Sequence, residues 1–300
     1  MLISICLCTY KRAHLIKTLE SINALTIPDN TEIEVIVIDN DEGKYAESIV
    51  FEKSDNYRHR LTYINQPIKN ISIARNEYLK AAKGEYIASL DDDEIVDKEW
   101  LVNLLNTAVK YKASVVFGQV KPIYPNHTPN WIVQGRFFDR KVRETGTEVS
   151  SGGAGCTLIR KEALLKTGYI FDAKFGKTGG EDSDLFYRLH KKGFKLVYCK
   201  EAFVSEEVEP ERLNCKYLFK RAIRIGQTFS RYRFTLIGFT VSKCLYISKA
   251  ILKMFLYAFL SVCALPFGKA TYITYVLKML DNFGKCYFFA TNDDLVELYK

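Results

Sequence analysis

The sequence predicts an α/β fold over its first two thirds, followed by a mostly helical and basic C-terminal region. Apolar runs typical of buried strands alternate with helical patterns across residues 1–120. Several of these runs end in polar or acidic residues, as expected where strands of an open sheet meet a ligand. The 300 residues are 48% apolar and 13% aromatic, which indicates a packed globular core and excludes a disordered chain.

The first five elements alternate between strand and helix. Residues 3–8 form a mostly apolar run, interrupted only by Ser4, which predicts the first strand. In residues 14–22, apolar side chains recur three and four positions apart, which predicts a helix. The run 34–38 predicts a second strand, 45–53 a helix and 61–65 a third, short strand.

The alternation then continues. Residues 72–82 have a helical pattern that closes at a glycine, and 85–90 form an apolar strand. Asp97 is a candidate N-cap for an amphipathic helix that reaches Ala108. Residues 114–120 predict another strand. The whole segment is therefore typical of half of a nucleotide-binding domain.

Four acidic residues stand together where the strand over residues 85–90 ends. They are Asp91, Asp92, Asp93 and Glu94. Adjacent carboxylates repel one another and raise one another's pKa, and a divalent cation removes this cost by taking their oxygens as ligands. A solvated acidic turn is the alternative, but the place at the end of a buried strand favours a ligand site.

A loop-rich insertion is expected over residues 121–150, which contain three prolines and Trp131. The glycines within 152–155 permit close backbone approach before the next predicted strand, 156–159. A tight turn is the alternative role of these glycines, because no helix follows in the register of a dinucleotide-binding motif.

A second pair of acids, Glu181 and Asp182, stands at the start of a predicted helix that ends at Gly193. Capping by Asp182 or Ser183 is one interpretation of this position. Helix capping alone could explain these acids at the start of the helix, without a catalytic role.

The cysteines and the N-terminal residues indicate the cellular compartment of the protein. The eight cysteines are scattered, without Cys-x-x-Cys or a zinc-type spacing, so we expect reduced and mostly buried thiols. The N-terminal apolar run lacks a basic segment before it and a cleavage site after it, so we interpret it as a strand and not as a signal peptide. Together these observations predict a cytoplasmic protein.

The positive charge belongs to the C-terminal third. Residues 210–290 hold 13 Lys and Arg against two acids, a balance of +11, whereas the whole chain carries +8. The apolar run 254–265 in this segment has twelve residues, too few to span a bilayer, which takes about 20. We therefore predict peripheral attachment to an anionic membrane surface. A helical subdomain with a basic solvated face is the alternative, and no nucleic acid is expected, because no binding motif accompanies the basic residues.

Five short motifs, in this order, resemble the signatures of the family-two inverting glycosyltransferases. They are Cys8-Thr-Tyr-Lys-Arg, Val35-Ile-Val-Ile-Asp-Asn, Ala74-Arg-Asn, Leu90-Asp-Asp-Asp-Glu and Gly180-Glu-Asp-Ser-Asp-Leu. Within the family, the chain looks most like the succinoglycan-type glucosyltransferases of bacterial polysaccharide biosynthesis. The resemblance covers about residues 1–210. It implies a GT-A fold, that is, a Rossmann-like nucleotide-binding sheet flanked by helices.

The resemblance also assigns the nucleotide sugar to the ends of the strands. The residues implied to face its base, ribose, sugar or phosphates are Thr9, Tyr10, Arg12, Asp39, Asn40, Arg75, Asp91 and Asp92. Many relatives have an acid at the position of Asn40, so the match is weaker there.

The acidic cluster matches the family's Asp-x-Asp element. By this resemblance, Asp93 and Asp91 ligate a Mg²⁺ or Mn²⁺ ion that bridges the donor diphosphate, and Asp91 or Asp92 supports the sugar or the ribose. A fixed dication stabilises the negative charge that grows on the departing diphosphate, most of all in the transition state.

Asp182 occupies the position of the family's general base, and Glu181 would position the base or the acceptor. The carboxylate would remove the acceptor's hydroxyl proton as that oxygen attacks the anomeric carbon opposite the leaving group. One displacement inverts the configuration, so an α-linked donor would yield a β-glycoside. Many relatives carry a later His that contacts the metal or phosphate, but residues 203–212 contain none. Glu206 and Glu207 are the candidates to take its place, and an acidic surface turn is the alternative.

These observations divide the chain into a catalytic domain over 1–212 and a basic, membrane-associated helical region over 213–300. Residues 1–120 would bind the nucleotide sugar and 121–212 the acceptor. The predicted function is transfer of a sugar, with a UDP-sugar as the expected donor, to a lipid-linked oligosaccharide at the inner face of the plasma membrane. A metal-dependent nucleotidyltransferase and a non-catalytic scaffold that binds nucleotide sugar or lipid are the alternatives.

Overall fold

The computed structural model describes residues 1–168, 170–176, 178–234 and 241–290. These residues form two compact units. The sheet unit consists of Met1–Pro122 and Arg140–Glu207, and the helical unit of Ile123–Asp139 and the described residues after Glu207. Residues 123–139, which we expected to serve the acceptor side of the catalytic domain, therefore group with the C-terminal helices.

An eight-stranded mixed sheet forms the centre of the sheet unit, in the order β3-β2-β1-β4-β7-β6-β8-β5. Strands β1 to β4 run parallel, whereas β7 is antiparallel to β4, β6 to β7 and β5 to β8. The strands are β1 (Leu2–Thr9), β2 (Glu32–Asp39), β3 (Arg60–Asn65), β4 (Tyr86–Asp91), β5 (Glu94–Val96), β6 (Val115–Ile123), β7 (Thr157–Arg160) and β8 (Leu196–Glu207). The predicted α/β fold with a helix-flanked sheet is confirmed.

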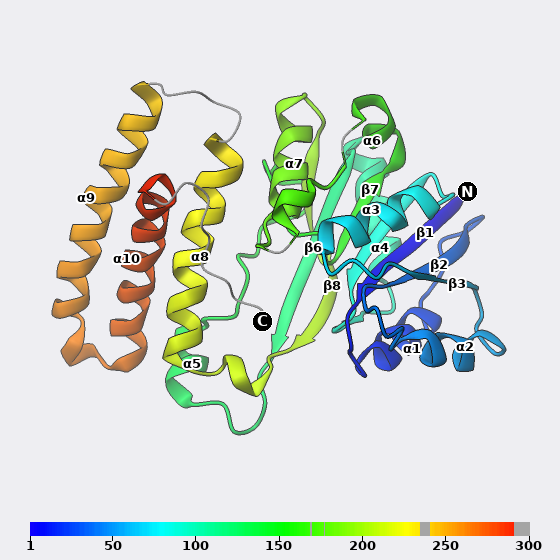
Figure 1. Ribbon diagram of the computed structural model, residues 1–300, viewed down its shortest axis with the longest axis horizontal. Coiled ribbons are helices and arrows are strands. Elements are labelled where there is room, and N and C mark those ends of the chain that lie inside the picture. Colours follow the sequence, from blue (N-terminus) through cyan, green and yellow to red (C-terminus); the bar gives the residue numbers. More distant parts are fainter. Residues whose placement is uncertain (169, 177, 235–240, 291–300) are drawn as a thin grey trace. The chain divides into compact units, whose positions relative to one another are not determined.

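Helices cover both faces of this sheet (Figure 1). One core cluster joins alternate residues of the central strands to α1, α2 and α4, and a second joins the other set to α3, α6 and α7. Because side chains alternate between the faces of a strand, a mostly apolar strand such as β1 supplies both clusters, with Ile3, Ile5 and Leu7 in the first and Cys6 in the second. The helices are α1 (Leu15–Asn23), α2 (Glu47–Ser54), α3 (Ile71–Ala81), α4 (Trp100–Tyr111), α6 (Lys161–Thr167) and α7 (Glu181–Lys191).

The structure corrects three local predictions. Helix α4 begins at Trp100 after Glu99, so Asp97 is not its N-cap; the Asp97 carboxylate instead accepts a hydrogen bond from the Glu99 amide, at 3.0 Å. Asp92 and Asp93 do form a turn, but the alternative of a solvated turn is wrong, because Asp92 is buried and Glu94, the first residue of β5, is fully buried. Strand β8 was missed altogether, because charged residues interrupt its apolar pattern.

Three long helices dominate the helical unit: α8 (Cys215–Phe234), α9 (Val241–Cys263) and α10 (Lys269–Ala290), together with the short α5 (Asn130–Gly135). Helix α10 packs along both α8 and α9 (Figure 1). Glycines allow its close approach to α8, since a Cβ at Gly284 would lie 2.1 Å from the carbonyl oxygen of Ile223. A separate core cluster in this unit gathers Ile132, Phe138, Val208, Leu213 and Leu218.

Two expectations about the C-terminal third and the cysteines need correction. The apolar run 254–265 is not an isolated segment, because most of it belongs to α9, a 23-residue helix long and apolar enough to cross a membrane. All eight cysteines are free, but only Cys6, Cys156 and Cys199 are buried, whereas Cys244 and Cys263 on α9 are exposed.

Candidate active site

The carboxyl ends of β1, β2 and β4 meet at one edge of the sheet. In the parallel register, Thr9 at the end of β1 lies opposite Asp39 at the end of β2, and Cys8 lies opposite Asp91 at the end of β4. The sheet itself therefore brings together the polar residues that follow these strands. In open α/β sheets, this edge is where ligands bind.

The residues after β1 form the first part of the site. Tyr10 is 39% exposed, and the ammonium group of Lys69 lies 4.5 Å from the centre of its ring. Arg12 reaches across to β4, where its Nη1 donates to Asp93 Oδ2 at 2.8 Å and its Nε lies 3.4 Å from Asp92 Oδ1. An exposed aromatic ring beside cations suits a flat base with attached phosphates.

Asp39 and Asn40 are buried and hold together the segments at this edge of the sheet. The Asp39 carboxylate accepts hydrogen bonds from the amides of Asp41 and Ala46 and from the hydroxyl of Tyr63. The amide nitrogen of Asn40 donates to two backbone carbonyls of the segment after β3, at 2.7 and 2.6 Å, and its oxygen accepts from the Asn70 amide at 3.0 Å. The groups of Asn40 are thus used within the protein, whereas Asp39 retains acceptor capacity, because a carboxylate offers about four lone-pair sites.

The acidic cluster is held in a largely dry environment. Burial raises the pKa of Asp92 to about 6. Burial and the charge of Asp91 raise the pKa of Asp93 to about 7, against the opposing effect of Arg12. Once these carboxylates lose their protons, we expect a divalent cation to bind in place of the protons, so metal binding should depend on pH.

Glu94, the first residue of β5, contacts the backbone of the acidic cluster. Its Oε2 accepts the Asp91 amide at 3.0 Å, while its Oε1 is buried without a hydrogen-bond partner among the described residues. Burial, followed by the charge of Asp91, raises the pKa of Glu94 well above its ordinary value. Gly155 packs directly on these acids, because a Cβ there would lie 2.6 Å from Asp91 Oδ2 and 2.8 Å from Glu94 Oε1.

Arg75 joins the acidic cluster to the second pair of acids. From α3, its Nη2 donates to Asp91 Oδ1 at 3.0 Å, and its Nη1 donates to Glu181 Oε1. Burial raises the pKa of Glu181 to about 7, and the adjacent guanidinium group opposes that rise. Arg75 thus fixes the start of α7 relative to Asp91.

Asp182 follows Glu181 in the first turn of α7 and is only partly buried. Its Oδ1 accepts the Ser183 amide at 2.6 Å, and its Oδ2 accepts the Ala154 amide at 3.3 Å. The N-cap is Gly180, with a φ of 94°, so Asp182 is not the cap. A partly exposed carboxylate held by two amides can accept a proton from a bound hydroxyl group.

Arg140 is a site residue that the sequence did not reveal. Its Nη2 donates to Glu206 Oε2 at 3.0 Å. Its Nη1 would lie 3.7 Å from a Cβ at Gly153, and Asp182 Oδ2 would lie 3.5 Å from that same atom. The charges of Glu94 and Glu206 raise the pKa of Arg140, against the opposing effect of partial removal from water. No local pattern marks this arginine, which stands in an irregular segment.

Glu206 reaches the site through the pairing of β8 with β5, which places it opposite Glu94. The sequence left open whether Glu206 or Glu207 replaces the His of many relatives. The ion pair with Arg140 offsets the charge of the Glu206 carboxylate beside the acidic cluster.

The donor chemistry of the cluster fits a hard divalent cation. Carboxylate oxygens are the ligands that Mg²⁺ and Mn²⁺ prefer. Within the described part of the chain, no group of three or more His, Cys, Asp or Glu side chains is arranged so that it could hold a metal ion by itself. An incomplete set also fits, because Mg²⁺ is usually held by one or two carboxylates together with substrate phosphates. Asp93 and Asp91 would supply the carboxylates.

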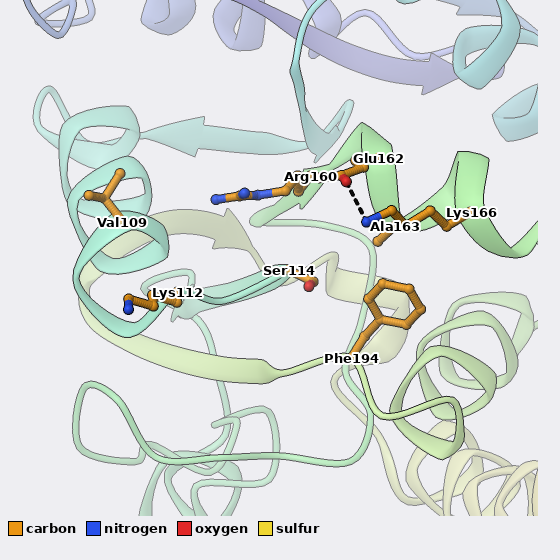
Figure 2. A pocket seen from close by; sticks show the side chains of 8 residues that line it. All are labelled: Val109, Lys112, Ser114, Arg160, Glu162, Ala163, Lys166 and Phe194. Atoms are coloured by element: carbon orange, nitrogen blue, oxygen red, sulfur yellow. Dashed lines mark ion pairs between the residues drawn. The ribbon is translucent and has the colours of Figure 1, made fainter.

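A cavity of about 340 Å³ in the sheet unit lies away from these residues (Figure 2). Among its lining residues are Ser114, Arg160 and Phe194, and the Glu162–Lys166 ion pair lies beside them. Arg160 pairs with Tyr86 at the first residue of β4, whereas Asp91 is the last residue of that strand. The cavity is therefore at the opposite end of β4 and does not belong to the candidate active site.

The chain was compared with known proteins. Residues 4–168 match the model of "Glycosyl transferase family 2". The succinoglycan biosynthesis protein ExoM of Rhizobium meliloti is 37% identical over 229 residues, which cover 76% of this chain and 74% of that protein. The protein WfgD of Escherichia coli, described as a UDP-Glc:alpha-D-GlcNAc-diphosphoundecaprenol beta-1,3-glucosyltransferase, is 28% identical over 174 residues, covering 57% of this chain and 64% of WfgD.

Two solved structures share the fold at low sequence identity. The mannosyltransferase PcManGT of Pyrobaculum calidifontis, in complex with GDP-Man and Mn²⁺, has a TM-score of 0.69 and 16% identity, and the match covers 97% of this chain and 88% of that one. S. aureus TarS 1-349 in complex with UDP has a TM-score of 0.55 and 16% identity, with 98% and 92% covered. These matches support the GT-A fold predicted from the sequence.

Proposed function

Because this chain belongs to glycosyl transferase family 2, we propose that it transfers a sugar from a UDP-sugar to a lipid-linked oligosaccharide, with inversion, in bacterial surface polysaccharide biosynthesis. Family membership makes the chain a glycosyltransferase and sets aside the nucleotidyltransferase and scaffold alternatives. One observation carries the mechanism: Arg75 bonds both Asp91 of the acidic cluster and Glu181 beside Asp182. Groups suited to the leaving diphosphate and to the acceptor are thereby held in one rigid arrangement.

In this proposal, Asp182 is the general base. Its carboxylate accepts the proton of the acceptor hydroxyl as that oxygen attacks the anomeric carbon. The Ser183 and Ala154 amides hold the two carboxylate oxygens in place. Glu181, anchored by Arg75, positions the helix turn that carries the base.

The leaving diphosphate would lie near Asp93 and Asp91, which we propose as the carboxylates that hold Mn²⁺ or Mg²⁺ against its phosphates. The bound cation supplies stabilisation of the negative charge that develops as the glycosidic bond breaks. Arg12 and Arg140 add cationic charge to the same region, through their pairs with Asp93 and Glu206. Thr9, Tyr10 and Asp39 would bind the base and ribose, and Asp92 the ribose or sugar.

The relatives support the choice of donor and acceptor. WfgD is named for a UDP-Glc donor and a diphosphoundecaprenol-linked acceptor, and TarS 1-349 was also solved with UDP-GlcNAc. A lipid-linked acceptor places the reaction at the inner face of the plasma membrane. The excess of Lys and Arg in the C-terminal third would favour that surface.

The proposal is tested by incubating the purified chain with candidate UDP-sugars and a lipid-linked acceptor, and analysing the products. We expect UDP and a β-linked product. Release of pyrophosphate, or retention of the donor's anomeric configuration, would contradict the proposed reaction.

Binding of UDP in the presence of Mn²⁺ should depend on Asp93 and on pH. UDP with Mn²⁺ should raise the melting temperature at pH 8, because a specific ligand stabilises the folded state. Since the pKa of Asp93 is raised to about 7, protons should displace the metal as pH falls from 8 to 6, with affinity falling roughly tenfold per pH unit where one proton is displaced. Thermal shifts measured across this pH range test the expectation.

The matched variant for this measurement is Asp93→Asn, which should lose the Mn²⁺-dependent part of the shift at every pH. Glu162→Gln, at an exposed position on α6, should behave like the parent. A pH-independent manganese effect in the parent chain would remove Asp93 from the metal site.

Removal of the Arg140 guanidinium should lower kcat more than it raises KM. Arg140→Met deprives the developing negative charge of a preorganised cation, a loss worth about 10²–10³ in kcat. Glu206→Gln should have a smaller effect, because the guanidinium remains. Lys141→Met, at the exposed neighbouring position, is the control for charge alone. Steady-state kinetics that show only a KM effect for Arg140→Met would assign this residue to acceptor or donor binding instead.

A further inference from the structure

Helix α9 has a broad apolar face that nothing in the described part of the chain covers. The exposed stripe consists of Val241, Leu245, Leu252, Phe255, Phe259 and Val262. Leu252, Phe255 and Phe259 are 71%, 65% and 66% exposed, although such side chains are usually buried. Positions separated by three, four and seven residues share one side of a helix, so the stripe runs along the length of α9.

The apolar surface continues past the end of α9. The turn between α9 and α10 exposes Leu265 and Phe267 at 60% and 74%. Contiguous exposed apolar surface of this extent marks a site of contact with another apolar phase.

The charged residues beside the stripe indicate the chemistry of the surface that it contacts. Helix α9 contains no Asp or Glu, and Lys249 and Lys253 stand exposed beside the stripe. Lys269 follows the turn. A basic helix with one aromatic and aliphatic face fits the interface of a bilayer that contains anionic lipid. A second copy fits less well, because its α9 offers no acid to meet these lysines.

The positions of the lysines also indicate whether α9 spans the bilayer or lies parallel to its surface. Lys249 and Lys253 lie near the middle of α9, where a spanning helix would hold both charges at the centre of the hydrocarbon. In a helix that lies flat, the same residues stand at the edge of the apolar face, and their stems let the ammonium groups reach the lipid phosphates. The opposite side of α9 packs on α10, where Lys278 lies 5.7 Å from the ring centre of Tyr257.

We infer that α9 is an in-plane membrane anchor: its stripe enters the interface of an anionic bilayer while Lys249 and Lys253 contact lipid phosphates. This inference rests on the membrane location in the proposed function and deepens it. It assigns attachment to one face of one helix and excludes a transmembrane α9.

Vesicle flotation with the full chain tests the anchor. We expect the chain to float with vesicles of phosphatidylcholine and phosphatidylglycerol, and more weakly with phosphatidylcholine alone. Phe255→Glu/Phe259→Glu should abolish flotation. Lys249→Gln/Lys253→Gln should weaken binding to the anionic vesicles by roughly fivefold per lysine. Leu165→Glu, at a position of α6 that is 72% exposed, is the matched control and should float like the parent.

Other outcomes would overturn the anchor. The anchor is rejected if the folded parent chain does not float. It is also rejected if the Phe255→Glu/Phe259→Glu variant floats like the parent. If that variant instead changes the oligomeric state in solution while no chain floats, the stripe is a contact between copies. Resistance of the membrane-bound parent to alkaline carbonate would indicate a spanning helix and reject the in-plane arrangement.

The anchor and the proposed reaction can fail separately. The phenylalanine variant should keep the Mn²⁺-dependent stabilisation by UDP, because α9 carries none of the proposed site residues. A parent chain that floats but gives no nucleotide-dependent shift would leave the anchor standing and count against the proposed donor.

Discussion

Replacement of Asp182 by asparagine is expected to lower the rate of sugar transfer by about 10²–10⁴-fold, the usual range for loss of a general base. The amide has nearly the same shape as the carboxylate but cannot accept the acceptor's proton. The Ser183 and Ala154 amides should still find an oxygen acceptor on the new side chain. Folding and donor binding should therefore change little, so the effect should appear in kcat.

Radiolabelled sugar transfer, measured alongside the thermal shift with UDP and Mn²⁺, separates these quantities. Glu162→Gln is the matched control, since Glu162 also stands in the first turn of a helix but lies far from the site at an exposed position. Transfer by Asp182→Asn at the parental rate would show that another group takes the proton.

Loss of the Arg75 guanidinium should both destabilise the chain and reduce transfer. Arg75 and Glu181 are buried, with side chains 9% and 6% exposed, and they form a direct ion pair. In Arg75→Met, Glu181 would be left in a dry environment without its cation. Removal of one partner from a buried pair typically costs about 3–5 kcal/mol. The start of α7, and with it Asp182, would also lose its link to Asp91, so transfer should fall as well.

This variant should have a distinctive pH dependence. Burial already raises the pKa of Glu181 to about 7, and without Arg75 that pKa should rise further. The folded state then keeps a proton that the unfolded state has lost above about pH 4.3, the ordinary value for Glu. Stability of Arg75→Met should therefore fall as pH rises from about 5 to 8.

Urea denaturation at several pH values measures both effects. The double variant Arg75→Met/Glu181→Gln should recover much of the lost stability, because it removes the uncompensated charge. Arg160→Met is the control: its Nη2 donates to the Tyr86 hydroxyl at 2.8 Å, and its loss should cost about 1 kcal/mol. An Arg75→Met chain as stable as the parent would mean that Glu181 is neutral in the native protein and that Arg75 has no structural role.

Short-range pattern was sufficient to predict the parallel part of the sheet. The apolar runs that became β1, β2 and β4 and the helical spacing of α1 and α3 are local signals, and their predicted ends differ from the observed ones by only a few residues. The polar residues after these strands could be grouped in advance, because parallel strands present their carboxyl ends at the same edge.

Strands β5 and β8 were not predicted. Strand β5 has three residues, and β8 carries charged residues through its length, so neither has a periodic apolar pattern. Strand β8 lies between β6 and β5 in the sheet, and its pairing with β5 places Glu206 opposite Glu94. The predicted metal and base residues had signals in the motifs, whereas Arg140 had none.

Periodicity, strand ends and short motifs are local properties, and they were enough to predict the fold class, the family and the acidic residues that the chemistry would need. Tertiary packing was needed to show that Arg75 joins Asp91 to Glu181, because Glu181 stands 106 positions from Arg75 along the chain. It also decided that the apolar stripe of α9 is exposed, because α10 covers only one side of that helix. Burial and long-range contact depend on which elements pack together, and packing is a property of the whole fold.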